Sequence, residues 1–164
     1  ANYIAAAMGT TINPTYTQVD VGVPFYGVYY GQSALPLSAE KIYYLTNETL
    51  KNCKVFDYES NAYMDMYDME KANGKDPYEL FLGGSKSLIT IENPSAATDK
   101  ELIVFRDSFG SSLSPLLVEG YAKVTVVDIR YISPVLLGNF IEFHGQDVLF
   151  IYSSLVLNNS STIK

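Results

Sequence analysis

Three short, almost wholly apolar runs in the C-terminal half constrain the fold most strongly: residues 102–105, 124–127 and 147–152. Strands that are apolar on both faces lie in sheets covered by helices on both sides. Apolar residues at helical spacing separate these runs, over 109–121 and over 134–144, and Gly145 follows the second stretch. The pattern over 100–157 therefore predicts a βαβαβ unit with a parallel sheet, in the α/β class.

Residues 10–92 are rich in tyrosine, glycine and short β-prone runs. Strands are expected over 15–30, 41–45, 54–58 and 87–91, joined by long loops, as a strand-rich insertion. Ahead of them, residues 1–8 are typical of the last two turns of a helix, with Gly9 as its C-cap glycine. A length of 164 residues suffices for one core but not for two ordinary domains. We therefore expect residues 1–164 to form part of a single domain and the chain to start inside that domain.

Charge and composition exclude several classes of function. The chain has 11 Lys and Arg against 18 Asp and Glu, a formal net charge of −7, and no basic cluster, which excludes a nucleic-acid partner. One cysteine, Cys53, and one histidine, His144, cannot form a zinc cluster. No metal or other cofactor is expected. No apolar run approaches the roughly 20 residues of a membrane span.

Two further patterns have simple interpretations. The acidic residues between 57 and 70 lack the central glycine and the final glutamate of a calcium loop, so they indicate a solvated loop. Gly83-Gly-Ser-Lys86 lacks the first glycine of a phosphate-binding loop and precedes a strand, so it indicates a turn. A phosphate- or nucleotide-binding function is disfavoured for the same reason.

Functional residue types follow two of the predicted parallel strands, at the edge where α/β proteins bind ligands. The first strand leads into Arg106-Asp-Ser-Phe-Gly110, and the second leads into Asp128-Ile-Arg-Tyr131. A serine at such a strand-to-helix turn, Ser108, can act as a nucleophile, with backbone N–H groups at the helix start receiving an oxyanion. The alternative is that Asp107 or Ser108 only caps the helix. Gly110 and the serines after it would let a substrate approach.

A serine nucleophile needs a base, and His144 is the only histidine. The order Ser108, Asp128, His144 matches that of α/β-hydrolases, although the Gly-x-Ser-x-Gly motif is absent. His144, however, lies where the predicted helix ends, and there an imidazole binds the last carbonyl groups. We therefore expect the base of Ser108 to lie outside this chain.

The 14 tyrosines and 8 phenylalanines, without tryptophan, fit either core packing or a surface that stacks on sugar rings. The tyrosines to consider for sugar contact are Tyr26, Tyr29, Tyr30 and Tyr131.

Five segments carry a family resemblance: Ile91-Glu-Asn-Pro94, Leu102-Ile-Val-Phe-Arg-Asp-Ser-Phe109, Ser114-Pro-Leu-Leu117, Val126-Val-Asp-Ile-Arg-Tyr131 and Asp147-Val-Leu-Phe-Ile-Tyr152. Upstream, Phe25-Tyr-Gly27 and Leu82-Gly-Gly84 add to it. Together they resemble the DHHW family, which looks like a branch of the SGNH hydrolases related to the alginate O-acetyltransferases. The resemblance implies an incomplete three-layer, flavodoxin-like parallel sheet.

The resemblance also implies a function. The family's serine falls on Ser108, and its arginine after the second strand falls on Arg130, where it could orient an acyl or sugar oxygen. The family's Asp-His-His-Trp segment has no counterpart here, and by family order it would precede residues 1–8. We expect a bacterial, secreted or cell-surface O-acetyl esterase or O-acetyltransferase acting on a polysaccharide, with Asp107, Gly110, Tyr131 and Tyr26 near the substrate. The alternative is a non-catalytic domain that binds a glycan or a surface partner.

Overall fold

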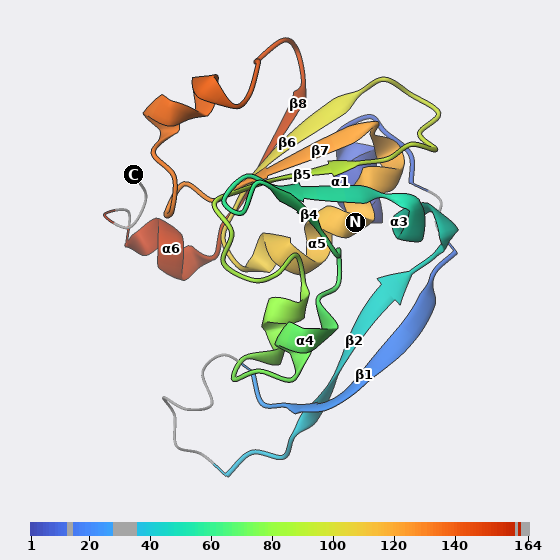
Figure 1. The fold of residues 1–164 in the computed structure, drawn as a ribbon, viewed down its shortest axis with the longest axis vertical. Coiled ribbons are helices and arrows are strands. Elements are labelled where there is room, and N and C mark those ends of the chain that lie inside the picture. Colours follow the sequence, from blue (N-terminus) through green and yellow to red (C-terminus); the bar gives the residue numbers. More distant parts are fainter. Residues whose placement is uncertain (13–14, 28–35, 160, 162–164) are drawn as a thin grey trace.

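The computed structural model describes residues 1–12, 15–27, 36–159 and 161, and Figure 1 shows its elements. Six strands form the main sheet in the order β4-β3-β5-β7-β6-β8. They are β3 (Lys54–Asp57), β4 (Ala62–Met64), β5 (Leu88–Glu92), β6 (Glu101–Arg106), β7 (Lys123–Val127) and β8 (Asp147–Ile151).

The three apolar runs of the C-terminal half form the parallel part of this sheet. β6 lies in the middle and pairs in parallel with β7 on one side and β8 on the other, which confirms the prediction for these strands. β5 pairs antiparallel with β7, and β3 pairs antiparallel with both β5 and β4. The sheet is therefore mixed: its β7-β6-β8 part is parallel, as predicted for residues 100–157, while β3, β4 and β5, which were expected in a strand-rich insertion, extend the same sheet with antiparallel pairs. The α/β class is confirmed.

The two connections between the parallel strands differ from each other. α5 (Phe109–Leu117) and the 3-10 turn η2 (Val118–Gly120) lead from β6 to β7, as predicted. The helix predicted over 134–144 is instead a shorter 3-10 helix, η3 (Pro134–Asn139), with Phe140 as its C-cap. The apolar spacing there has another cause, because Leu137 and Ile141 pack on the sheet with Ile103 and Val127.

Apolar side chains cover both faces of the sheet. One face packs against α5 and η2, where Val104 and Val126 meet Leu117 and Val118. The other face packs against η3 through Leu137. Helical segments on both faces explain why β6 and β7 have apolar side chains on both sides.

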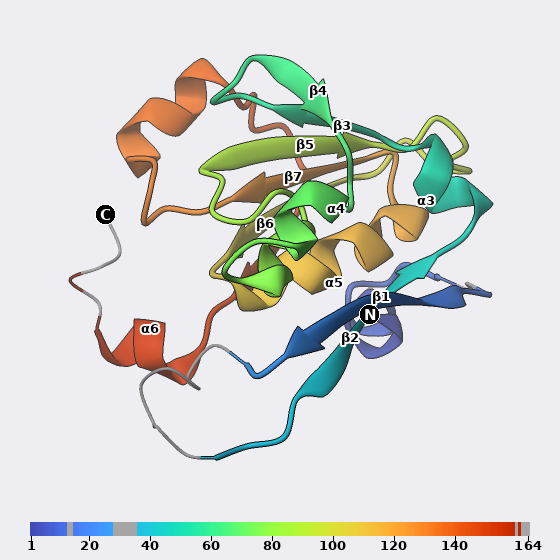
Figure 2. The same ribbon diagram turned by 60° about the horizontal axis from the view of Figure 1, so that its bottom comes forward.

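The N-terminal part begins with α1 (Asn2–Ala7), and Gly9 follows at φ +67°, as predicted. β1 (Thr17–Phe25) and β2 (Glu40–Thr46) form a separate antiparallel pair. Figure 2 shows α5 between this pair and the six-stranded sheet. Short helical segments complete the fold: α3 (Glu48–Asn52), α4 (Met69–Ala72), η1 (Pro77–Leu80) and α6 (Ser154–Asn158).

Candidate functional site at the end of β6

Ser108 lies in the turn between β6 and α5, at the carboxyl end of the central parallel strand. The residue is exposed, and its side chain does not cap the helix. Within the described residues, no hydrogen bond involves its hydroxyl group. The hydroxyl is therefore available to a ligand.

Asp107, not Ser108, holds the start of α5. One carboxylate oxygen, Oδ1, accepts a 2.9 Å hydrogen bond from the Phe109 N–H, and Oδ2 accepts one of 2.6 Å from the Ser153 N–H. Asp107 is only 1% exposed. Its carboxylate thus joins the turn after β6 to the turn after β8, and burial keeps it from contact with a substrate.

Of the N–H groups at the helix start, only one is unoccupied among the described residues. The Phe109 N–H donates to Asp107 Oδ1, the Gly110 N–H donates to the Asp107 carbonyl, and the Ser111 N–H donates to the Ser108 carbonyl. The Ser108 N–H has no such partner. An oxyanion next to the Ser108 hydroxyl could therefore accept a hydrogen bond from the N–H of Ser108 itself.

Tyr78, from η1, fixes the Ser108 turn from outside. Its hydroxyl oxygen lies 3.1 Å from the Ser108 carbonyl oxygen and 2.9 Å from Ser112 Oγ. A phenol has one proton, so Tyr78 can donate to the carbonyl while it accepts from the Ser112 hydroxyl. No feature of the local sequence indicated this contact, because Tyr78 is distant along the chain.

Asp128 and Arg130 form a tight ion pair at the end of β7. Arg130 Nε and Nη2 donate to Asp128 Oδ1 and Oδ2 at 2.9 and 2.7 Å, and the Arg130 N–H donates to Oδ1 at 3.1 Å. The hydrogen bonds to Asp128 raise the pKa of Arg130 above its ordinary value. The Arg130 side chain keeps 22% exposure. Among the described residues its Nη1 has no hydrogen bond, and that nitrogen can reach a ligand.

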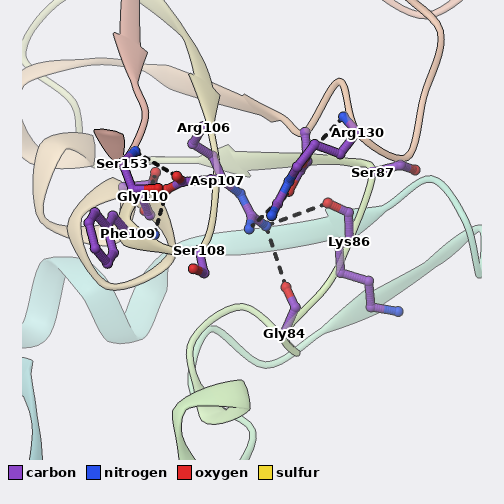
Figure 3. A network of polar contacts seen from close by, with 12 residues as sticks. Gly84, Lys86, Ser87, Arg106, Asp107, Ser108, Phe109, Gly110, Arg130 and Ser153 are labelled. Atoms are coloured by element: carbon purple, nitrogen blue, oxygen red, sulfur yellow. Dashed lines mark hydrogen bonds and ion pairs between the residues drawn. The ribbon is translucent and has the colours of Figure 1, made fainter. Parts of the chain in front are cut away.

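Arg106 is a buried cation that the sequence interpretation did not select. Its Nη2 donates to the Gly84 and Lys86 carbonyls at 3.4 and 3.5 Å, and its Nη1 lies 3.6 Å from Asp128 Oδ2 (Figure 3). Burial lowers the pKa of its guanidinium, and the Asp128 carboxylate opposes this effect. The sequence did contain a signal: a charged residue directly after an apolar strand has to be paired.

Tyr152, just after β8, lies near the charged groups at this end of the sheet. Its hydroxyl is buried without a hydrogen-bond partner among the described residues. Burial raises the pKa of Tyr152 to about 12, and the nearby carboxylates of Asp128 and Asp107 act in the same direction.

The other predicted residues lie as follows. Gly110 is buried and does not open a path for substrate: a Cβ atom there would lie 2.4 Å from Arg106 Cβ, so glycine lets the helix approach β6. Tyr131 is 50% exposed, and the Arg130 guanidinium lies 5.3 Å from its ring centre. Tyr26 is 43% exposed and follows Phe25, whose ring stacks on Tyr78. Tyr29 and Tyr30 lie outside the described residues.

His144 lies at the wrong end of the sheet to serve Ser108. It lines a small pocket with Glu101 and Lys123, the first residues of β6 and β7, whereas Ser108 follows the last residue of β6. Its Nδ1 lies 2.9 Å from the Glu142 carbonyl oxygen, beyond the end of η3, so the predicted role as a helix cap was also wrong. The described residues place Asp128 with arginines and not with His144.

The acidic stretch from residue 57 is not uniformly solvated. Asp57 is buried and accepts a 2.8 Å hydrogen bond from Lys86 Nζ. In the described part of the chain, no group of three or more His, Cys, Asp or Glu residues is placed to hold a metal ion. None of the helices described there has the length and apolar character that a bilayer crossing requires.

Comparison with known families gives one match, to the family described as DHHW protein, over residues 4–127. The match covers most of the chain, which therefore belongs to the DHHW family. It ends with β7, directly before Asp128 and Arg130. No curated protein sequence matches the chain.

Solved structures resemble the fold. A DHHW family protein from Eubacterium siraeum superposes with a TM-score of 0.69 at 18% identity, over 94% of this chain and 54% of that one. Bacillus cereus PatB1 carrying a sulfonyl adduct gives 0.66 at 20% identity, over 95% and 56%. PatB1 without it gives 0.65 at 18%, over 95% and 57%. The chain thus spans little more than half the length of these structures.

Proposed function

We propose that the chain carries the serine half of an acyl-transfer site, with Ser108 as the nucleophile. The observation that supports this proposal is the hydrogen bonding at the β6–α5 turn. Asp107 binds the N–H group at the helix start, and the Ser108 hydroxyl and N–H have no partners among the described residues. A serine that only capped the helix would use its hydroxyl for that purpose.

The proposed reaction is acyl transfer from an ester. Ser108 Oγ attacks the ester carbonyl carbon, its proton passes to a base, and the oxyanion accepts a hydrogen bond from the Ser108 N–H. The alcohol leaves with a proton returned by that base. Water or a sugar hydroxyl then attacks the acyl-serine ester and regenerates Ser108. Arg130, through its unoccupied Nη1, orients the acyl or sugar oxygen.

We propose further that the base and its carboxylate partner come from the family's Asp-His-His-Trp segment, which this sequence does not contain. On this account the protein is of the SGNH-hydrolase kind, related to the alginate O-acetyltransferases. Its substrate is an O-acetylated polysaccharide of the cell surface, and the protein is secreted or held at that surface. The likeness to a PatB1 structure with a sulfonyl adduct supports a nucleophilic site, because sulfonyl reagents attach to activated nucleophiles.

Replacement of the serine in the full-length protein tests this proposal. We expect Ser108→Ala to abolish turnover of a simple acetyl ester, with an unchanged Tm. Ser95→Ala is the control, since exposed Ser95 lies in the turn at the other end of the sheet and should leave turnover unchanged. Turnover by Ser108→Ala equal to that of the wild type would contradict the assignment.

One observation favours the second candidate, a non-catalytic domain that binds a glycan or a surface partner. His144, the only histidine of the sequence, is at the opposite end of β6 from Ser108. Glycan binding that survives Ser108→Ala, in a full-length protein without ester turnover, would favour this candidate.

A further inference from the structure

Arg106 connects three segments around the Ser108 turn. Its guanidinium reaches the carbonyls of Gly84 and Lys86 in the loop before β5, and it faces the Asp128 carboxylate after β7. Figure 3 shows the guanidinium directed toward those carbonyls, with the Ser108 turn next to the base of the side chain. One side chain thus links the β6 end, the 84–86 loop and the β7 end.

The side chain has little freedom to move. Arg106 is 1% exposed, and its stem lies against Gly110, where a Cβ atom would come within 2.9 Å of Arg106 Cγ. Its Nε has no hydrogen-bond partner among the described residues. A buried cation with an unpaired nitrogen reduces the stability of the fold. A contribution to stability therefore does not explain why an arginine occupies position 106.

Asp128 is shared between the two arginines. It is fully buried and binds Arg130 through both oxygens, while Arg106 Nη1 faces the same Oδ2 that Arg130 Nη2 uses. The Asp128 N–H also donates to the Ser87 carbonyl at 2.9 Å, which ties this group to the 84–87 loop. Among the described residues, Arg130 would be the only cation left beside this buried carboxylate without Arg106, and it alone would then determine how the carboxylate lies.

We propose that Arg106 is a positioning residue of the Ser108 site, which sets through Asp128 and the 84–86 carbonyls where Arg130 and the loop lie relative to the serine. This inference rests on the proposed function for its catalytic consequence, but its structural part can be tested separately. Arg106 itself contacts no substrate.

Arg106→Met in the full-length protein is the principal test. We expect kcat for an acetyl ester to fall by about 10- to 100-fold with little change in KM, because Arg130 and the 84–86 loop lose their alignment with Ser108. We expect amide hydrogen exchange to become faster over residues 82–87. Arg106→Lys, which keeps the charge, should recover part of kcat. Val104→Ala is the control: this buried residue precedes Arg106 on the same face of β6 and should lower Tm without faster exchange over 82–87.

A charge-pair comparison gives a second test that does not depend on turnover. Each of Arg106→Met and Asp128→Asn leaves a buried charge with fewer partners, and each should lower Tm by roughly 10 °C. Because Arg106 and Asp128 face each other, the double variant should lower Tm by less than the sum of the two single effects. A double variant whose loss in Tm equals the sum of the two single losses would overturn the proposal, as would unchanged kcat and exchange in Arg106→Met.

The two proposals fail in different ways. Wild-type protein whose turnover does not depend on Ser108 would refute the proposed function, while the exchange and Tm comparisons would still decide whether Arg106 positions the loop and Asp128.

Discussion

At the scale of single residues, the β6–α5 turn depends on Asp107. Its two carboxylate oxygens accept hydrogen bonds from the N–H groups of Phe109 and Ser153, which belong to turns after different strands. Asp and Ser are both favoured helix caps, so the pair Asp107-Ser108 did not reveal which residue caps and which stays available. The structure resolves this choice through the two hydrogen bonds of Asp107, and the one from distant Ser153 is not a local property of the sequence.

Asp107→Ala removes both of these hydrogen bonds. Because each joins a buried carboxylate to a backbone N–H, we expect a loss of about 2–4 kcal/mol in the free energy of unfolding, measured by urea denaturation. The comparison variant is Asp68→Ala, which removes the cap of the short helix α4 and should cost about 1 kcal/mol. Equal effects of the two substitutions would argue against a special role for Asp107.

At the scale of elements, the close approach of α5 to β6 requires a glycine at position 110. An alanine Cβ there would lie 2.4 Å from Arg106 Cβ. Alanine normally stabilises a helix relative to glycine, but here overpacking should dominate. We expect Gly110→Ala to lower the free energy of unfolding by about 1–3 kcal/mol.

The matched control is Gly138→Ala in η3, where no atom lies within 4 Å of the added Cβ, so its stability should not fall. Thermal unfolding of the two variants provides the measurement. A Gly110→Ala protein as stable as the wild type would show that α5 does not pack on β6 as described.

A second contact between elements joins β3 to the loop before β5. Asp57, buried at the end of β3, binds Lys86. Desolvation would raise the pKa of Asp57, but hydrogen bonds from Lys86, Ser60 and the Glu59 N–H outweigh it and hold that pKa below its usual value of 3.8. A lowered folded-state pKa stabilises the fold above the unfolded value and loses this contribution as the pH falls through the folded value.

Lys86→Met should therefore cost roughly 2 kcal/mol near pH 7, and the difference from the wild type should shrink below about pH 4. Urea titrations at several pH values measure it. Lys51→Met, which breaks the exposed pair with Glu48, should leave stability nearly unchanged at every pH. A Lys86→Met deficit that grows toward acid pH would contradict this explanation.

The elements themselves were predictable to different degrees. β6, β7 and β8 were evident because continuous apolar runs are a local signal. The antiparallel pairing of β5 with β7 was not, since a buried strand such as 88–91 has the same apolar character in either direction. The prediction of an α-helix over 134–144 was wrong. The spacing of apolar residues that suits an α-helix also suits a 3-10 helix that is followed by Ile141, with Leu137 and Ile141 packed on the sheet.

At the scale of the whole molecule, β8 is an edge strand of the main sheet. Phe150 on this strand is 66% exposed and stacks on Phe105 of β6. An exposed apolar edge is a template for pairing with another strand. We expect the 164-residue chain to self-associate through this edge, and Phe150→Lys to reduce the association in size-exclusion chromatography.

Tyr3→Lys is the control for that prediction. It removes an even more exposed aromatic side chain from α1, outside the sheet, and should leave the elution volume unchanged. If Phe150→Lys and wild type elute alike as larger species, the association does not involve β8.

The central claim is that Ser108 is a nucleophile. The most direct measurement is reaction of the full-length protein with a sulfonyl fluoride, followed by peptide mass mapping. We predict one sulfonyl group per chain, on Ser108, and no labelling of the Ser108→Ala variant. Labelling at another residue, or a wild-type protein that turns over acetyl esters while Ser108 stays unlabelled, would contradict the account.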